Sequence, residues 1–340
     1  MKRLLAAMAA LLLSTIVPAR SLSAAPTTTV DLRPYGLSTA LDVKLGVFYV
    51  SKDRLALFFD QQLPATGPHS HSFQLIILNI EGQTAAQMTL RGDPNAIDIT
   101  PGPDGGLLVG REGQLDFYDS RLQVERSITV SPATTGVRFD RERNQLVVMT
   151  LEQELGHRTA HFLSGDTLKE SAALTYPIRS NAVFGENQLV YTVSGNCHGA
   201  AHITSDKVAW RPLDTIPACD PLTFISSDRL AYAFDGSLYT VDSSGKELLQ
   251  ARIPAPDTFE EPRFIGLSED HARLALSALK KKTFSSGWPY HDEVFVYDLV
   301  SKRLIFKHAL EPGYGAEALS PDGHQLAVIS QGALLLIPLP

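Results

Sequence analysis

The sequence predicts an all-β protein built from seven repeated units of four antiparallel strands. Three observations lead to this fold class. A strand-turn-strand pattern recurs seven times, and an alternating strand that ends in a small polar residue follows the first six copies. In addition, no stretch after residue 24 keeps a 3.6-residue apolar period over three helical turns.

The clearest copy of the repeat is LSPDGHQLAVIS (319–330), in which a polar turn is followed by a leucine and alternating apolar residues. Six earlier segments have the same order. The matched leucines are Leu55, Leu107, Leu146, Leu189, Leu230, Leu274 and Leu326. Their spacings are 52, 39, 43, 41, 44 and 52 residues. A period of about 40–50 residues is typical of the blades of a β-propeller.

A third strand is recognised in each of the first six units, because it ends in Asn, Asp or Ser. Such residues start tight turns. These residues are Asn79, Asp119, Ser164, Ser205, Asp242 and Asp298. A further short strand follows each of them. Residues 25–340 are therefore predicted to form one propeller domain. The expected blades are 46–91, 95–130, 136–175, 181–213, 221–253, 262–310, and 316–340 together with 27–33.

The segment SPDGHQLAV (320–328) resembles the repeats of TolB-like and WD40-like β-propellers, in which a Ser-Pro-Asp-Gly turn joins the first two strands. VYDLVSKRL (296–304) resembles their turn between the third and fourth strands. The resemblance implies a seven-bladed propeller. It implies little about activity, because this class of fold has many functions.

The two ends of the domain are expected to share one blade. After residue 330 only ALLLIPLP (333–340) remains, which provides a third strand but no fourth. TTTVDLR (27–33) is a β-rich segment ahead of the first complete blade. We expect it to pair with 333–339 and close the ring, which removes an exposed sheet edge. An open ring with a disordered N-terminal segment is the alternative.

Residues 1–24 have the pattern of a secretory signal peptide, with a basic start, an apolar run over 4–17 and small residues at the end. The run is shorter than the roughly 20 residues that span a bilayer, so a retained anchor is the weaker alternative. Without this segment the net charge changes from −7 to −10. An acidic chain does not favour nucleic acid or an anionic membrane as partner. We expect a soluble, exported monomer in the periplasm or outside the cell.

Two long connections are expected on one face of the propeller, at residues 60–72 and 278–292, on either side of a short connection in blade 7. Long connections on a rigid scaffold are common binding sites. The predicted ligand-binding residues are Trp288, Tyr290, His291, His69, His71 and Tyr314. The alternative for Trp288 is that it packs against its own loop.

Non-catalytic binding of a protein, a peptide or a glycan, without a cofactor, is the predicted function. The alternative is a propeller enzyme, lactonase-like or quinoprotein-like, that uses the central opening. Few polar residues begin the first strands, and they are too few to predict a metal cage: Asp98, Arg138, Asn181, Arg263 and Glu317. A weaker alternative is a metal site formed by His69, His71 and His291.

Cys197 and Cys219 are predicted to form a disulfide, because both fall on the same face in neighbouring blades and export permits oxidation. A loop of about 20 residues corresponds to roughly 3 kcal/mol in the chain-entropy description. Thiol titration of the unfolded, unreduced protein is expected to find no reactive thiol. Two reactive thiols would show that the cysteines are free.

Overall fold

The computed structural model describes most of the chain from residue 26 onward. The described ranges are 26–37, 45–61, 72–91, 97–111, 113–178, 180–193, 200–204, 207–213, 222–226, 229–234, 237–242, 247–252, 259–280, 292–310 and 315–340. Within them every element is a strand, apart from three short 3₁₀ helices. These are η1 (Arg33–Tyr35), η2 (Pro103–Gly105) and η3 (Gln153–Leu155). The all-β prediction is confirmed. The predicted signal peptide, residues 1–24, lies outside the described residues.

In the described residues the strands form seven four-stranded antiparallel sheets, numbered here along the chain. Sheet 1 contains β2 (Leu45–Ser51), β3 (Arg54–Gln61), β4 (Ser72–Asn79) and β5 (Thr84–Arg91). Sheet 2 contains β6 (Ile97–Pro101), β7 (Leu107–Arg111), β8 (Gln114–Tyr118) and β9 (Val124–Thr129). Sheet 3 contains β10 (Thr134–Asp140), β11 (Gln145–Glu152), β12 (His157–Ser164) and β13 (Glu170–Pro177).

The remaining sheets follow the same order of strands. Sheet 4 contains β14 (Ser180–Gly185), β15 (Gln188–Val193), β16 (Ala200–Thr204) and β17 (Lys207–Leu213). Sheet 5 contains β18 (Leu222–Ser226), β19 (Arg229–Phe234), β20 (Ser237–Asp242) and β21 (Glu247–Arg252). Sheet 6 contains β22 (Phe259–Leu267), β23 (Arg273–Lys280), β24 (Asp292–Asp298) and β25 (Arg303–Ala309). Sheet 7 contains β26 (Ala316–Leu319), β27 (Gln325–Ser330), β28 (Ala333–Pro338) and β1 (Thr28–Asp31).

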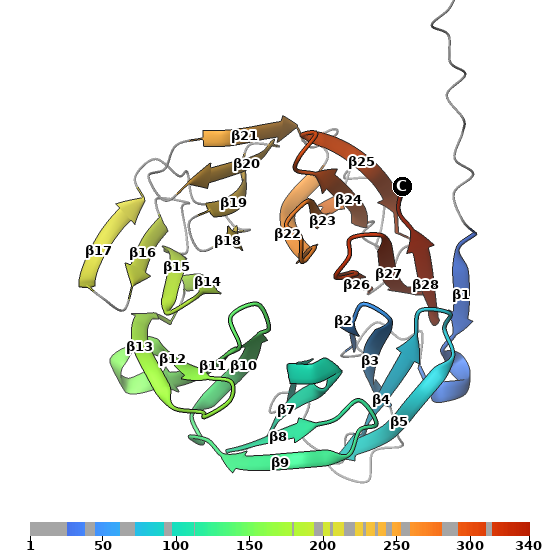
Figure 1. Ribbon diagram of the computed structural model, residues 1–340, viewed down its shortest axis with the longest axis horizontal. Coiled ribbons are helices and arrows are strands. Elements are labelled where there is room, and N and C mark those ends of the chain that lie inside the picture. The colour runs from blue at the N-terminus through green and yellow to red at the C-terminus, as the bar shows by residue number, and fades with distance from the viewer. Residues whose placement is uncertain are drawn as a thin grey trace, which may run out of the picture.

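The sheets are arranged around a common axis as the blades of a β-propeller, with the first strand of each nearest the axis (Figure 1). Among the described side chains, seven buried apolar clusters lie between successive sheets. The cluster between sheets 6 and 7 includes Val296 and Leu326. The cluster between sheets 7 and 1 includes Leu55 and Leu336. Each sheet therefore covers one face of the next, and no layer of helices is needed.

The N-terminal strand β1 pairs antiparallel with β28, from Thr28 opposite Leu336 to Asp31 opposite Ala333. The strand is shorter than the predicted 27–33. It ends at Asp31 because the Asp31 carboxylate accepts a hydrogen bond from the Arg33 amide (3.1 Å). Pro34 has no amide hydrogen with which to extend the ladder, and it lies in η1, which begins at Arg33. Leu32 is fully buried in the cluster between sheets 7 and 1.

The repeated leucine marks the second strand of every sheet. All seven matched leucines are buried at or near the start of that strand, from Leu55 in β3 to Leu326 in β27. The polar end of the third strand also has the predicted role. Asn79 Oδ1 accepts the amide of Gln83 (2.8 Å), and Asp119 Oδ1 accepts the amide of Gln123 (2.8 Å). The sequence repeat therefore reflects two structural features: a leucine buried in the second strand and a hydrogen-bonded turn after the third strand.

The Ser-x-Asp turns at the start of the repeat have a common hydrogen-bond pattern. The hydroxyl of Ser320 donates to Asp322 (2.6 Å) and accepts the amide of Gln325 (2.9 Å). Ser268 makes the same contacts with Asp270 (2.6 Å) and the amide of Arg273 (2.9 Å). The turn of sheet 7 needs a residue at φ 71°, which Gly323 adopts without strain.

We expect deletion of residues 25–33 to lower the melting temperature by about 5–10 °C, because it removes buried Leu32 and exposes an edge of β28. Differential scanning calorimetry measures the change. Arg33→Ala is the control, since the exposed ion pair of Arg33 with Asp31 adds little stability. A deletion variant that melts at the same temperature as the full chain would contradict this role of β1.

The hydrogen bond from Ser268 lowers the pKa of the Asp270 carboxyl, with help from the amide of Ala272. Because the folded pKa is depressed, its stabilisation is present above the ordinary value near 4 and is lost as the pH falls through the lower folded value. Asp270→Asn should therefore reduce the free energy of unfolding equally at pH 7 and pH 5, with a smaller difference below about pH 4. Urea unfolding at several pH values measures this. A difference that already shrinks between pH 7 and pH 5 would contradict it.

Candidate functional site

The antiparallel order gives the propeller two distinct faces. The turn face carries the connections from first to second and from third to fourth strands. The loop face carries the connections from second to third strands and those between sheets. The chain leaves β3 at Gln61 and β23 at Lys280, both at the loop face, and the segments 62–71 and 281–291 that follow lie outside the described residues. Between them, sheet 7 has only a tight turn at Gln331 and Gly332.

The predicted ligand-binding residues are in these long connections or beside them. Trp288, Tyr290, His291, His69, His71 and Tyr314 all lie outside the described residues. Cys197 and Cys219 also lie outside them. The structure gives the ends of the two long connections, and the proposed site between them remains a prediction.

The inward polar residues considered for an enzyme are largely engaged in intramolecular contacts. The side chain of Arg263 forms an ion pair with Glu317 (3.1 Å) and donates to the hydroxyl of Ser277 (2.7 Å). Glu317 is almost fully buried. Asp98 Oδ2 accepts the amide of Val137 (2.8 Å), which joins sheets 2 and 3.

The two other inward candidates give no additional site. The Arg138 side chain is exposed, and the Asn181 side chain lies outside the described residues. Within the described part of the chain no group of three or more His, Cys, Asp or Glu side chains could hold a metal ion. The same part contains no helix that is long and apolar enough to cross a membrane.

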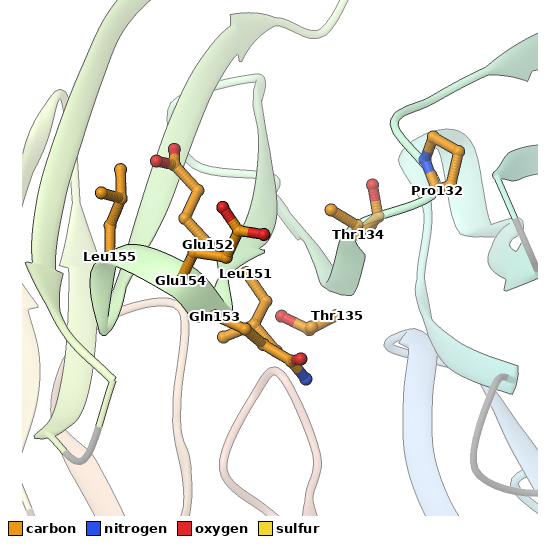
Figure 2. Close-up of a pocket in the computed structure, with 9 residues that line it drawn as sticks. Pro132, Thr134, Thr135, Leu151, Glu152, Gln153, Glu154 and Leu155 are labelled. Carbon is orange, nitrogen blue, oxygen red and sulfur yellow. The ribbon is translucent and has the colours of Figure 1, made fainter.

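A recess of about 600 Å³ opens at the loop face of sheet 3. It is lined by Pro132, Ala133, Thr134, Thr135, Leu151, Glu152, Gln153, Glu154 and Leu155. One wall is the connection from sheet 2 to sheet 3, and the other is η3 with the end of β11. Figure 2 shows the carboxylates of Glu152 and Glu154 on one side and Pro132 and Thr134 on the other.

Short hydrogen-bonded turns form both walls. The amide of Thr134 donates to the carbonyl of Ser131 (2.9 Å), and the amide of Leu151 donates to the carbonyl of Ala133 (2.8 Å). The second of these bonds ties the two walls together. Gly156 ends η3 with φ 70°, a value that few other residues adopt easily. These backbone hydrogen bonds fix the positions of the two walls.

A polar network holds the acidic wall in place. The carboxylate of Glu152 contacts Nε2 of His157 (3.1 Å) and accepts the hydroxyl of Thr159 (3.3 Å). The other ring nitrogen of His157 lies 3.3 Å from the carbonyl of Leu155. His157 thus touches both ends of η3. Glu154 and Leu155 are exposed at the rim, and Leu155 retains 67% of its accessible surface.

The sequence did not predict this recess. Its second-to-third-strand connection is only four residues long, at 153–156, whereas the prediction followed long connections. The available signal was LEQELGH (151–157), which places two acidic residues and an apolar one in a turn ended by glycine. The opposite wall comes from the connection between sheets, so the local sequence alone does not show a cavity.

On the turn face, charged side chains from the turns of different sheets lie close to one another. Nε2 of His271 in sheet 6 lies 3.6 Å from the carboxylate of Glu142 in sheet 3. Burial lowers the pKa of Arg141, although Glu269 and Asp104 oppose the shift. Charged turns from sheets that are not neighbours therefore meet near the axis on this face. The loop face has the recess and the long connections.

These features define a β-propeller with a recess on its loop face. No protein-family model matches the sequence, and no curated protein matches it. Solved propellers are similar in structure. The chain resembles BBS1N from a complex with ARL6DN, with a TM-score of 0.50 and 17% identity over 93% of this chain and 96% of the other. It also resembles Hsv2 of Kluyveromyces lactis, with a TM-score of 0.50 and 13% identity over 85% and 91% of the two chains. At these identities the likeness establishes the fold alone.

Proposed function

We propose that this protein is a non-catalytic interaction propeller that binds another protein through its loop face. The observation that carries the proposal is the recess of about 600 Å³ at sheet 3, on the face that also carries the two longest connections. A rigid scaffold with its binding elements at one end is a common arrangement for recognition. BBS1N, a structural neighbour, was solved in complex with ARL6DN, which fits this use of the fold.

The intramolecular contacts of the inward polar side chains support binding rather than catalysis. Arg263 and Glu317 neutralise each other, and Asp98 accepts a backbone amide. Such contacts join neighbouring sheets. A catalytic role would require these groups to exchange their partners for a substrate or a metal ion.

The proposal includes a ring of seven blades closed by β1, of the TolB-like or WD40-like repeat type. It is supported by the β1–β28 pairing and by the Ser-x-Asp turns at Ser268 and Ser320. A hydrogen bond from the Tyr49 hydroxyl to Gln325 (2.9 Å) also links sheets 1 and 7.

The proposal further includes export, guided by residues 1–24, and a second contact region above sheet 7. Trp288 is its leading anchor, with Tyr290 and Tyr314 beside it and the histidines of the two long connections as polar contacts. Large aromatic residues are frequent anchors of interfaces, because they bury much area with few rotatable bonds. A peptide or a glycan would use the same aromatic surface.

We expect the double substitution Trp288→Ala and Tyr290→Ala to abolish capture of the natural partner from the native extracellular fraction, with the melting temperature unchanged. Loss of an interface anchor typically costs at least about 2 kcal/mol, or roughly a thirtyfold loss of affinity. Val300→Ala is the control, because Val300 is 78% exposed on the turn face. Unchanged capture with a melting temperature several degrees lower would show that the aromatic residues belong to the protein core.

A further inference from the structure

The recess at sheet 3 has two exposed groups of different chemistry at its rim. Glu154 makes no ion pair or hydrogen bond within the described part of the chain. Leu155, beside it in the sequence, keeps 67% of its surface accessible. We infer that this recess binds a short extended segment of a partner protein in which a Lys or Arg side chain is next to an apolar side chain. The inference rests on the proposed interaction function and assigns the kind of partner.

Charge complementarity favours a basic residue. The wall that contains η3 has the carboxylates of Glu152 and Glu154, and no Lys or Arg is among the residues that line the recess. The Glu152 carboxylate already contacts His157 and Thr159, so Glu154 is the more available acceptor. A guanidinium or ammonium group donates charge-assisted hydrogen bonds to a carboxylate, whereas an anionic segment would be repelled.

The apolar half of the recess favours a polypeptide over a small cation. Leu155 is one of four large apolar side chains that are exposed in the described residues, with Ile80, Val124 and Val300. Of these four, it alone lines the recess. Leu151, Pro132 and Ala133 add apolar surface. Covering Leu155 requires an apolar group close to the cation. In an extended segment, side chains two residues apart lie on the same face and provide this pair.

Size and rigidity agree with a short segment. A volume of about 600 Å³ is within the usual range for ligand sites and accommodates a few side chains. The hydrogen bond from Leu151 to Ala133 joins the two walls, and Gly156 fixes the end of η3. A preformed site loses little conformational entropy when it binds. The rest of the partner would extend over the loop face.

The test uses the full chain with methyl-labelled leucines and three terminally blocked pentapeptides. The peptides are Ala-Leu-Ala-Arg-Ala, Ala-Leu-Ala-Glu-Ala and Ala-Ala-Ala-Arg-Ala. In the first two, the leucine and the charged residue of an extended chain share one face. We expect the first to shift the methyl signals of Leu151 and Leu155 in NMR titrations, with a dissociation constant on the order of 1 mM. The glutamate peptide should not bind, and the peptide without leucines should bind several-fold more weakly.

Two substitutions locate the contact. Glu154→Gln should weaken binding of the arginine peptide by about threefold, since one exposed ion pair is lost. Leu155→Ala should weaken it by about fivefold, with Leu151 as the remaining reporter. The matched controls are Glu125→Gln and Val300→Ala, which change exposed residues away from the recess and should leave the affinity unaltered. Thermal melts confirm that each variant is folded.

Four results would overturn the inference: failure of the pentapeptides to bind, equal binding of the glutamate peptide, no effect of either rim substitution, or binding of arginine amide as tight as that of the peptide. The last would identify a small cation as the ligand. If the pentapeptides fail while partner capture still depends on Trp288, the interaction function stands and only the recess inference falls. If capture is independent of Trp288 and the peptides also fail, both are wrong.

Discussion

The structure depends on burial of both faces of each four-stranded sheet by the neighbouring sheets. Second and third strands such as β3 and β4 are almost wholly buried, with Leu55, Leu57 and Ile76 fully inaccessible. A row of such sheets would leave two apolar faces in water. Sheet 7 packs on sheet 6 through one cluster and on sheet 1 through another. The contribution of β1 to sheet 7 follows from the same constraint, since β28 would otherwise present an unpaired edge.

This packing places the variable parts of the chain at the two ends of the strands. The turn face is constrained, because the Ser-x-Asp turns contact one another. Arg273 donates to the carbonyl of Gly323 (2.8 Å), and the amide of Glu269 donates to the carbonyl of Pro321 (2.7 Å). Changes in those turns would disturb the contact between sheets 6 and 7. At the loop face, the described residues form the recess at sheet 3.

The fold was largely predictable because the repeated residues have the same structural role in each sheet. Each matched leucine is buried at the same place in its sheet. Four of the polar turn residues accept neighbouring amides, namely Asn79, Asp119, Ser164 and Asp298. Boundaries were less certain: β22 begins at Phe259 rather than 262, where two bulges alter its pairing with β23. The ion pair of Arg263 with Glu317 joins residues 54 positions apart, which no local pattern indicates. The recess was missed for the same reason, since Pro132 and Leu155 come from different connections.

The packing between sheets 2 and 3 changes from apolar to polar along the strands toward the recess. Between sheets 2 and 3 the core is apolar toward the turn face, at Leu108 and Leu146. Toward the loop face, sheet 3 instead presents Thr150 and His161, whose ring also contacts Glu170 (2.8 Å). Polar groups in such a position stay stable when they bond one another or water. The His161 ring joins Thr150 and Glu170 through its two nitrogens. At the rim above them, Glu154 and Leu155 are exposed on the loop face.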